Sequence, residues 1–227
     1  MPADSPRASS PSPEDGPDRP TPHVTAELTP GDILDLRAYE RVRDDYRRRV
    51  IALKRRRRVP LGPIMTAHFE NADTVRFQVQ EMARAERIAT DEGVQAELDV
   101  YNRLLPAPGE LSATLFVELT SEEELRHWLP RLVGVETAIC FELGSLEVFS
   151  VPEATHAESL TRDAVTPAVH YLRFPFPPDA LALFRGETPV ALTVRHPEYE
   201  ARTPIDAATR AELLSDLEGR HELLELP

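Results

Sequence analysis

The sequence contains very little cysteine. Cys140 is the only one among 227 residues, and it lies in an apolar run from residue 137 to residue 143. A single cysteine excludes an intrachain disulfide, a cluster ligated by several cysteines and a dithiol relay. We therefore expect Cys140 to be a buried and unreactive thiol. A chain without disulfides also suits a reducing compartment, so we expect a cytoplasmic protein.

Long hydrophobic runs and short catalytic motifs are missing as well. No run of about 18 apolar residues could cross a membrane, and no apolar stretch follows a basic start as in a secretory signal. The chain has no Gly-rich phosphate loop and no Gly-x-Ser-x-Gly elbow. We expect no membrane association, and the enzyme classes that carry such motifs are not supported. Because haem and flavin pockets need no short motif, the cofactor is unknown.

Charge is unevenly distributed along the chain. The formal net charge is −13, yet residues 37–58 hold eleven Lys or Arg against three acidic residues, a net of +8 that leaves −21 for the rest. Such a basic segment binds a polyanion, an acidic partner or the acidic remainder of its own domain. We rank nucleic-acid binding last, because aromatic residues do not interleave with the basic patch. The patch consists of Lys54, Arg55, Arg56, Arg57 and Arg58.

Three segments differ in composition. Residues 1–28 are rich in Pro, Ser, Asp and Glu with scarcely any large apolar side chain, which predicts a disordered tail. Residues 29–220 have the length and apolar content of one globular domain. Residues 221–227 are expected to form a C-terminal tail.

The helical signals begin with a long basic helix that starts near Thr29 and ends before Pro60. Its apolar stripe recurs every three or four residues, at Tyr39, Val42, Tyr46, Val50 and Leu53. A central helical segment follows over residues 82–105, with an interruption near residues 90–93. Shorter helices are expected at residues 121–132 and 179–184, and Asp206 caps a C-terminal helix that ends near residue 217.

Seven strands are expected, at residues 64–70, 74–80, 112–119, 137–143, 146–151, 169–174 and 190–196. Several form hairpins, and they do not alternate regularly with helices as a doubly wound parallel sheet requires. The sequence therefore predicts an α+β domain built on a mainly antiparallel sheet or a partly closed barrel.

A row of polar side chains is the most distinctive feature of the expected strand 74–80. Alternation places Arg76, Gln78 and Gln80 on one face, and this face ends at Glu81. A guanidinium, two amides and a carboxylate in one line suit a ligand or partner surface; a solvated sheet face is the alternative.

Metal binding is the sharpest enzymatic hypothesis. Carboxylates and imidazoles at Glu81, Glu86, His170 and His196 are suitable ligands for iron, manganese or zinc. No Glu-x-x-His pair is present, so these four would have to converge through the fold. Whether a metal binds is therefore unknown, and ion pairs of Glu81 with nearby arginines are the alternative.

Five residues are candidates for a binding site or for structural roles. Tyr101 and Asn102 precede a turn, where they either reach into a pocket or order the loop. His196 and Tyr199 follow a strand, where they either converge on a ligand or form the turn. His170 lies within a strand and is expected to be buried and hydrogen-bonded.

Five stretches together carry a resemblance to a known family. They read RVIALKRRRRVPLGP, FENADTVRFQVQEMARAER, ELDVYNRLLPAPGELSATLFVE, VHYLRFPF and RHPEY. With them the chain resembles an uncharacterised bacterial family, a domain of unknown function, over about residues 29–217. The resemblance implies a redox or oxidative-stress setting near rubrerythrin-like proteins and iron–sulfur proteins related to heterodisulfide reductases. It implies no activity and no oligomeric state.

Three functional hypotheses follow. The first is an accessory or binding protein that docks a redox partner, either rubrerythrin-like or an iron–sulfur protein, through the polar row and the basic helix. The second is an enzyme or sensor with a pocket lined by Arg76, Gln78, Glu81, Glu86, His170 and His196. The third is nucleic-acid binding through the basic patch.

Overall fold

The computed structural model describes residues 27–153, 165–220 and 223–226. Most of the predicted N-terminal tail, residues 1–26, lies outside the described residues. The protein is α+β, as predicted. Its helices are α1 (Leu36–Arg56), α2 (Ala72–Glu86), α3 (Asp91–Tyr101), α4 (Glu122–Trp128), α6 (Pro178–Arg185) and α7 (Ala207–Leu217). Its strands are β1 (Arg58–Leu61), β2 (Met65–Glu70), β3 (Glu110–Val117), β4 (Ile139–Leu143), β5 (Leu146–Phe149), β6 (Val151–Pro152), β7 (Val169–Pro175), β8 (Val190–His196) and β9 (Tyr199–Pro204).

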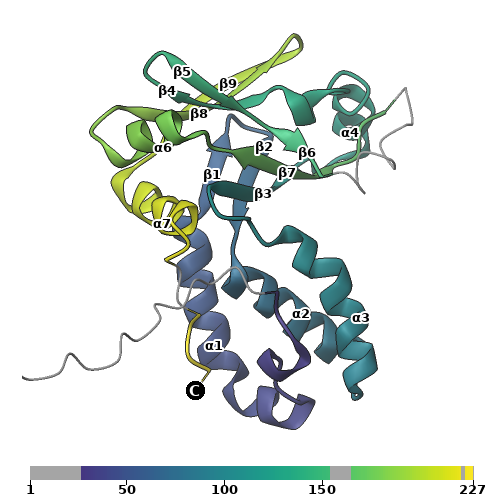
Figure 1. Ribbon diagram of the computed structural model, residues 1–227. Helices are drawn as coiled ribbons and strands as arrows, with labels where there is room; N and C mark the ends of the chain where they lie inside the picture. The colour runs from purple at the N-terminus through teal and green to yellow at the C-terminus, as the bar shows by residue number, and fades with distance from the viewer. Residues whose placement is uncertain (1–26, 154–164, 221–222, 227) are drawn as a thin grey trace, which may run out of the picture.

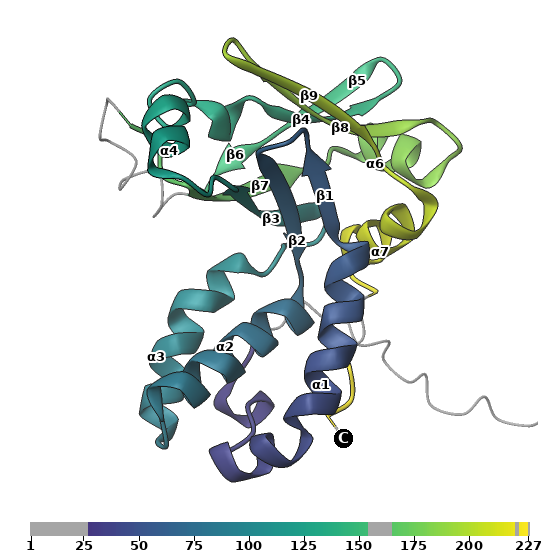
Figure 2. The ribbon, with the colours of Figure 1, turned by 180° about the vertical axis from the view of Figure 1, so that it is seen from behind.

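The strands form two antiparallel sheets and not a closed barrel. Sheet A has the order β1-β2-β3-β7-β6 and sheet B the order β5-β4-β8-β9. The apolar core lies between them, where the ring centroid of Phe141 in β4 is 5.6 Å from that of Phe69 in β2 and 5.1 Å from that of Phe174 in β7. Figures 1 and 2 show sheet A between sheet B and a layer formed by α1, α2 and α3.

The spacing of the apolar stripe of α1 predicted packing on the core or on a second helix, and the stripe packs against α2. Tyr39, Tyr46, Val50 and Leu53 are buried, and Val42 is partly buried beside them. The helix begins later than expected, because Thr29 caps a separate 3-10 turn over Pro30–Asp32. The carboxylate of Asp35 caps α1 itself, since it accepts hydrogen bonds from the backbone N–H groups of residues 37 and 38 at 2.9 Å.

The strand expected at residues 74–80 is wrong, because this segment is the first half of α2. Asn71 caps the helix: its side-chain oxygen accepts from the backbone N–H of Thr74 at 3.0 Å, and the Thr74 hydroxyl accepts from the N–H of Asn71 at 2.9 Å. This reciprocal cap outweighs the β propensity of the valines. Val75 and Val79 are four residues apart and lie buried on the same helix face.

Three strands were not expected. β1 follows α1 directly and contains Pro60, which an edge strand tolerates because its outer N–H groups pair with no neighbour. β9 occupies the segment expected as a turn after β8, and the short β6 pairs with β7. Among the described residues, no helix combines the length and the apolar character that a membrane span requires.

The two ends of the described chain pack onto the helical layer. Leu28, expected in the tail, is buried against Val75, Val79 and Leu98. Near the C-terminus, Leu224 packs on the buried residues of α1, and its backbone N–H donates to both carboxylate oxygens of Asp73 in α2, at 3.0 and 3.1 Å.

Candidate ligand pocket

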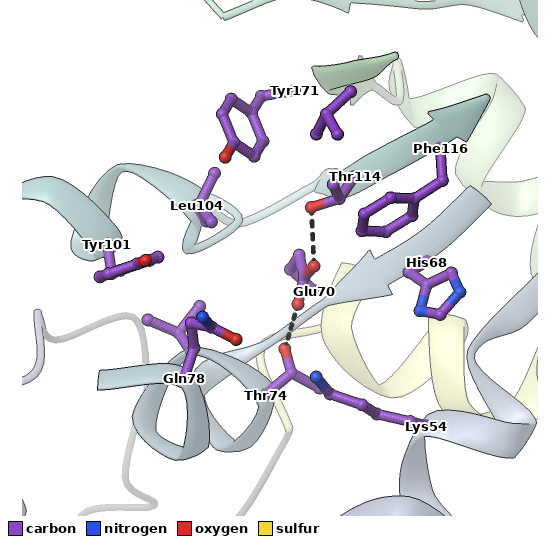
Figure 3. A pocket seen from close by; sticks show the side chains of 12 residues that line it. Lys54, His68, Glu70, Thr74, Gln78, Tyr101, Leu104, Thr114, Phe116 and Tyr171 are labelled. Carbon is purple, nitrogen blue, oxygen red and sulfur yellow. Dashed lines mark hydrogen bonds between the residues drawn. The ribbon is translucent and has the colours of Figure 1, made fainter. Parts of the chain in front are cut away.

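A pocket of about 340 Å³ lies between the outer face of sheet A and the helical layer. Figure 3 shows the side chains that line it. The sheet wall comes from β2, β3 and β7, and the helical wall from α1, α2, α3 and the turn that follows α3. Its lining is therefore assembled from segments distributed over most of the described sequence.

Strand alternation and register build the sheet wall. In β2, His68 and Glu70 point away from the core residues Ala67 and Phe69. His68 pairs with Thr114 of β3, and Thr114 pairs with Tyr171 of β7. Three residues from distant parts of the sequence thus lie in one row. The neighbouring row contributes Phe116 and Val169.

Glu70 occupies the centre of the pocket (Figure 3). One carboxylate oxygen accepts a hydrogen bond from the Thr74 hydroxyl of α2 at 2.5 Å, and the other accepts from the Thr114 hydroxyl of β3 at 2.7 Å. A carboxylate has about four acceptor sites. Two hydroxyls therefore orient Glu70 from both walls and leave acceptor capacity toward the pocket.

His68 and the aromatic residues supply neutral hydrogen-bonding and stacking groups. Burial lowers the pKa of His68, although nearby Glu70 acts in the opposite direction, so the imidazole is neutral at pH 7. Its ring packs edge-on against Phe116 with centroids 5.1 Å apart. Burial also raises the pKa of Tyr171, which keeps its phenol protonated.

Lys54 brings a positive charge from the C-terminal turn of α1 into the helical wall. Its Nζ atom lies 5.6 Å from the ring centroid of Phe77. Among the described residues, neither the Lys54 amine nor the Glu70 carboxylate forms an ion pair. The pocket thus contains two opposite charges without an ionic partner in the described part of the chain.

Comparison with known proteins identifies the family. The model of a family described as proteins of unknown function, DUF3501, matches residues 27–217. The chain belongs to the DUF3501 family. A crystal structure of a novel protein of unknown function from Burkholderia pseudomallei is similar, with 36% sequence identity and a TM-score of 0.77 over 85% of this chain and 100% of that one. No curated protein matches the chain.

The polar row expected on a sheet face does not exist in this DUF3501 protein, because its members lie around a helix. Arg76 is 5% exposed and donates to Asp73 at 2.9 Å and to the Tyr46 hydroxyl at 3.1 Å. Gln80 is buried and makes two 2.9 Å hydrogen bonds with the backbone of Leu34. Gln78 alone of the row lines the pocket.

Glu81 ties α1 to α2. Its carboxylate accepts hydrogen bonds from the Tyr39 hydroxyl at 2.6 Å and from the Arg43 guanidinium at 2.8 and 2.7 Å. The Arg43 hydrogen bond, more than any other contact, lowers the pKa of Glu81. Glu81 therefore forms a structural ion pair. Its partner is Arg43 and not one of the arginines next to it in sequence.

The four metal candidates are not brought together. Glu81 lies between α1 and α2, Glu86 is exposed at the end of α2, and His170 is buried beside Thr166 at 3.2 Å. His196 uses both ring nitrogens, since Nε2 lies 3.0 Å from the Val133 carbonyl and Nδ1 accepts from the N–H of Glu198 at 3.2 Å. In the described ranges, no group of three or more His, Cys, Asp or Glu residues could hold a metal.

The remaining candidates divide between the pocket and the framework. Tyr101 lines the pocket. Asn102 hydrogen-bonds the backbone of Leu28 in both directions, at 3.1 and 2.9 Å. Tyr199 is buried and donates to the carbonyl of Leu61 at 2.6 Å. Cys140 is buried as expected, and burial raises the pKa of its thiol to about 11.

The basic patch lies largely against acidic groups of its own domain, one of the alternatives left open by the charge pattern. Arg56 donates to Glu212 at 2.5 Å and Arg58 to Glu118 at 2.9 Å. Arg57 is only 1% exposed, and it donates to Asp216 and to the Phe69 carbonyl. Arg55 is exposed.

Sequence reasoning missed the sheet wall of the pocket, at His68, Glu70, Thr114, Phe116 and Tyr171. A signal was present in MTAHFE, where polar side chains alternate with core residues. The sequence analysis places the polar face on the next segment, residues 74–80, which is helical.

Proposed function

We propose that this DUF3501 protein binds a small organic ligand between sheet A and the helical layer. The observation that carries the proposal is Glu70, a carboxylate held by hydroxyls from both walls at the centre of a partly apolar cavity. Small-molecule sites have this character: a concave apolar lining with a few polar groups in defined positions.

Thermal unfolding with a library of small polar and aromatic metabolites tests the proposal. A ligand that binds only the folded protein at 100 times its Kd stabilises it by about 2.7 kcal/mol. For a domain of this size, such a gain raises Tm by several degrees. Mass spectrometry of molecules released from protein purified from its native host provides an independent search.

Two substitutions distinguish this pocket from other binding surfaces. Glu70→Gln keeps the shape of the side chain and removes its charge, so it should abolish the ligand-dependent shift. Glu118→Gln is the matched control, because Glu118 follows β3 and pairs with Arg58 outside the pocket. An equal shift in the wild type and Glu70→Gln would place the ligand elsewhere and contradict the proposal.

The pocket suits a sensor or an enzyme. A neutral His68 and the Glu70 carboxylate are both groups that act as general bases. Chemical change of a bound ligand over time, absent in Glu70→Gln, would favour the enzyme; an unchanged ligand would favour a binding protein or sensor.

The redox partner implied by the family resemblance stays a prediction. Its expected docking surface has to be abandoned, because Arg76 and Gln80 are buried. Affinity purification from the native host followed by iron analysis tests this hypothesis. A co-purified iron protein would support it, and a partner-free preparation would contradict it.

Nucleic-acid binding remains the last of our proposals. The ion pairs of Arg56, Arg57 and Arg58 with acidic groups of the same domain leave the patch little free charge. Sub-micromolar affinity for DNA or RNA at about 150 mM salt would reverse this ranking.

A further inference from the structure

We propose that the ligand is a small zwitterion with one aromatic ring, of the size and chemistry of an aromatic α-amino acid. This inference rests on the proposed function, since it names the class of ligand that occupies the same pocket. Three features carry it: the charges, the walls and the volume.

The two opposite charges that line the pocket favour a ligand that carries one positive and one negative group. Glu70 and Lys54 both line the cavity, and neither forms an ion pair with a described residue. Charges taken partly out of water are costly unless they are paired. An ammonium group on the ligand pairs with Glu70, and a carboxylate pairs with Lys54. A ligand with one charge leaves the other pocket charge without a partner.

Other charged residues near the pocket do not alter this balance. On the same face of sheet A, Arg58 pairs with Glu118, and Arg173 pairs with Glu110. His68 is neutral at pH 7. The formal charge of the lining is therefore zero, as a neutral zwitterion requires.

The aromatic side chains in the pocket walls favour a ligand with an aromatic ring. Phe116 and Tyr171 come from the sheet, and Tyr101 faces them from the end of α3 (Figure 3). Aromatic side chains prefer edge-on or offset contacts with another ring. The volume of about 340 Å³ is near the lower end of known ligand sites, so it suits a single ring with a short polar part.

Four probes separate these requirements when they are titrated calorimetrically into the full-length chain at pH 7. L-Phenylalanine has both charges and the ring, phenethylamine lacks the carboxylate, 3-phenylpropionate lacks the ammonium, and L-alanine lacks the ring. We expect L-phenylalanine to bind at least about tenfold more tightly than each of the other three.

Two variants assign each charge to its partner. Lys54→Met should remove the advantage of L-phenylalanine over phenethylamine, and Glu70→Gln should remove its advantage over 3-phenylpropionate. Arg55→Met and Glu118→Gln are the controls, since Arg55 is the exposed neighbour of Lys54 and Glu118 lies outside the pocket. Both controls should retain the order of affinities. Melting of each unliganded variant verifies that it is folded.

The results that overturn the inference are distinct. If phenethylamine or 3-phenylpropionate equals L-phenylalanine, the ligand is not a zwitterion; if L-alanine equals it, no ring is recognised. If none of the four binds but another metabolite shifts Tm in a Glu70-dependent manner, the ligand class is wrong and the proposed function stands. If no small molecule binds in a Glu70-dependent manner, both fail.

Discussion

The packing between the two sheets and the packing within the helical layer are stabilised by different kinds of contact. Between the sheets, the contacts are aromatic and aliphatic: Phe141 of β4 packs on Phe69, Phe174, Phe176 and Phe184 with ring centroids 5.1 to 6.0 Å apart. Such contacts carry no charge, so their stability depends on shape and buried area.

The helical layer is joined by buried or partly buried ion pairs as well as by apolar contacts. They connect α1 to α2 (Arg43 with Glu81), the residue that follows α1 to α7 (Arg57 with Asp216), and two positions of α2 (Arg76 with Asp73). Removal of one partner from such a pair leaves an uncompensated charge.

The contrast indicates which kind of substitution destabilises each of the two regions. An apolar substitution between the sheets creates a cavity, whereas a single charge removed from the helical layer exposes its partner to an environment that cannot solvate it. The pocket lies between sheet A and the helical layer, so changes in the helical layer reach Lys54, Thr74 and Gln78 first.

The largest expected effect is a cavity between the sheets. Phe141→Ala should lower the free energy of unfolding by about 3 to 5 kcal/mol, because Phe141 is fully buried and contacts four other rings. Urea denaturation measures this. Phe149→Ala in the paired strand is the control: this side chain is 45% exposed, and its loss should cost about 0.5 kcal/mol or less. Equal losses would mean that the core does not lie where the packing places it.

The next effect concerns the buried charge of the helical layer. Asp216→Ala should cost about 3 kcal/mol, because Arg57 then keeps a buried charge whose remaining acidic neighbour is Glu212, with 3.6 Å between the nearest nitrogen and oxygen. In the double variant Arg57→Met with Asp216→Leu, both charges are replaced by apolar groups, and the loss should be smaller than in the single variant. If the double variant loses as much as the sum of the single variants Arg57→Met and Asp216→Leu, the charges are not coupled.

A smaller effect is expected at Glu81. Glu81→Gln should cost about 1 to 2 kcal/mol near pH 7, because hydrogen bonds from Arg43 and Tyr39 to a charged acceptor are weakened. The folded-state pKa of Glu81 is lowered from 4.5, so its contribution is present above that value and is lost as pH falls through the folded pKa. The stabilities of wild type and variant should therefore converge below about pH 4.5. A constant difference down to pH 2 would contradict this role.

The smallest expected effect comes from a comparison of two neighbouring arginines of the basic patch. Arg56 is 47% exposed and pairs with Glu212, whereas its neighbour Arg57 is buried. Arg56→Ala should change the free energy of unfolding by about 0.5 kcal/mol or less. Both arginines belong to the basic patch of the sequence, and only the structure distinguishes the exposed one from the buried one. A loss above about 2 kcal/mol in Arg56→Ala would show that the surface pair is coupled to the buried one.

Features that depend on residues close in sequence were predictable. The apolar stripe of α1, the hairpin of β4 and β5 around Gly144, and the start of α7 are all present. Asp206 caps α7 by accepting from the backbone N–H of Thr209 at 2.7 Å. The wrong prediction of a strand at residues 74–80 has the same local origin. The β-prone residues in the first half of α2 favoured a strand, whereas the Asn71 cap starts a helix.

The sequence by itself determined the helix stripe, the hairpin signals, the α+β class and the family, because each depends on spacing within a short window or on matched segments. Only the tertiary structure decided the site. Antiparallel register placed His68, Thr114 and Tyr171 in one row, and packing of α1 and α2 brought Lys54 and Thr74 to the Glu70 side of the sheet. No local pattern encodes such an assembly, because strand register and layer packing are set by interactions between distant segments.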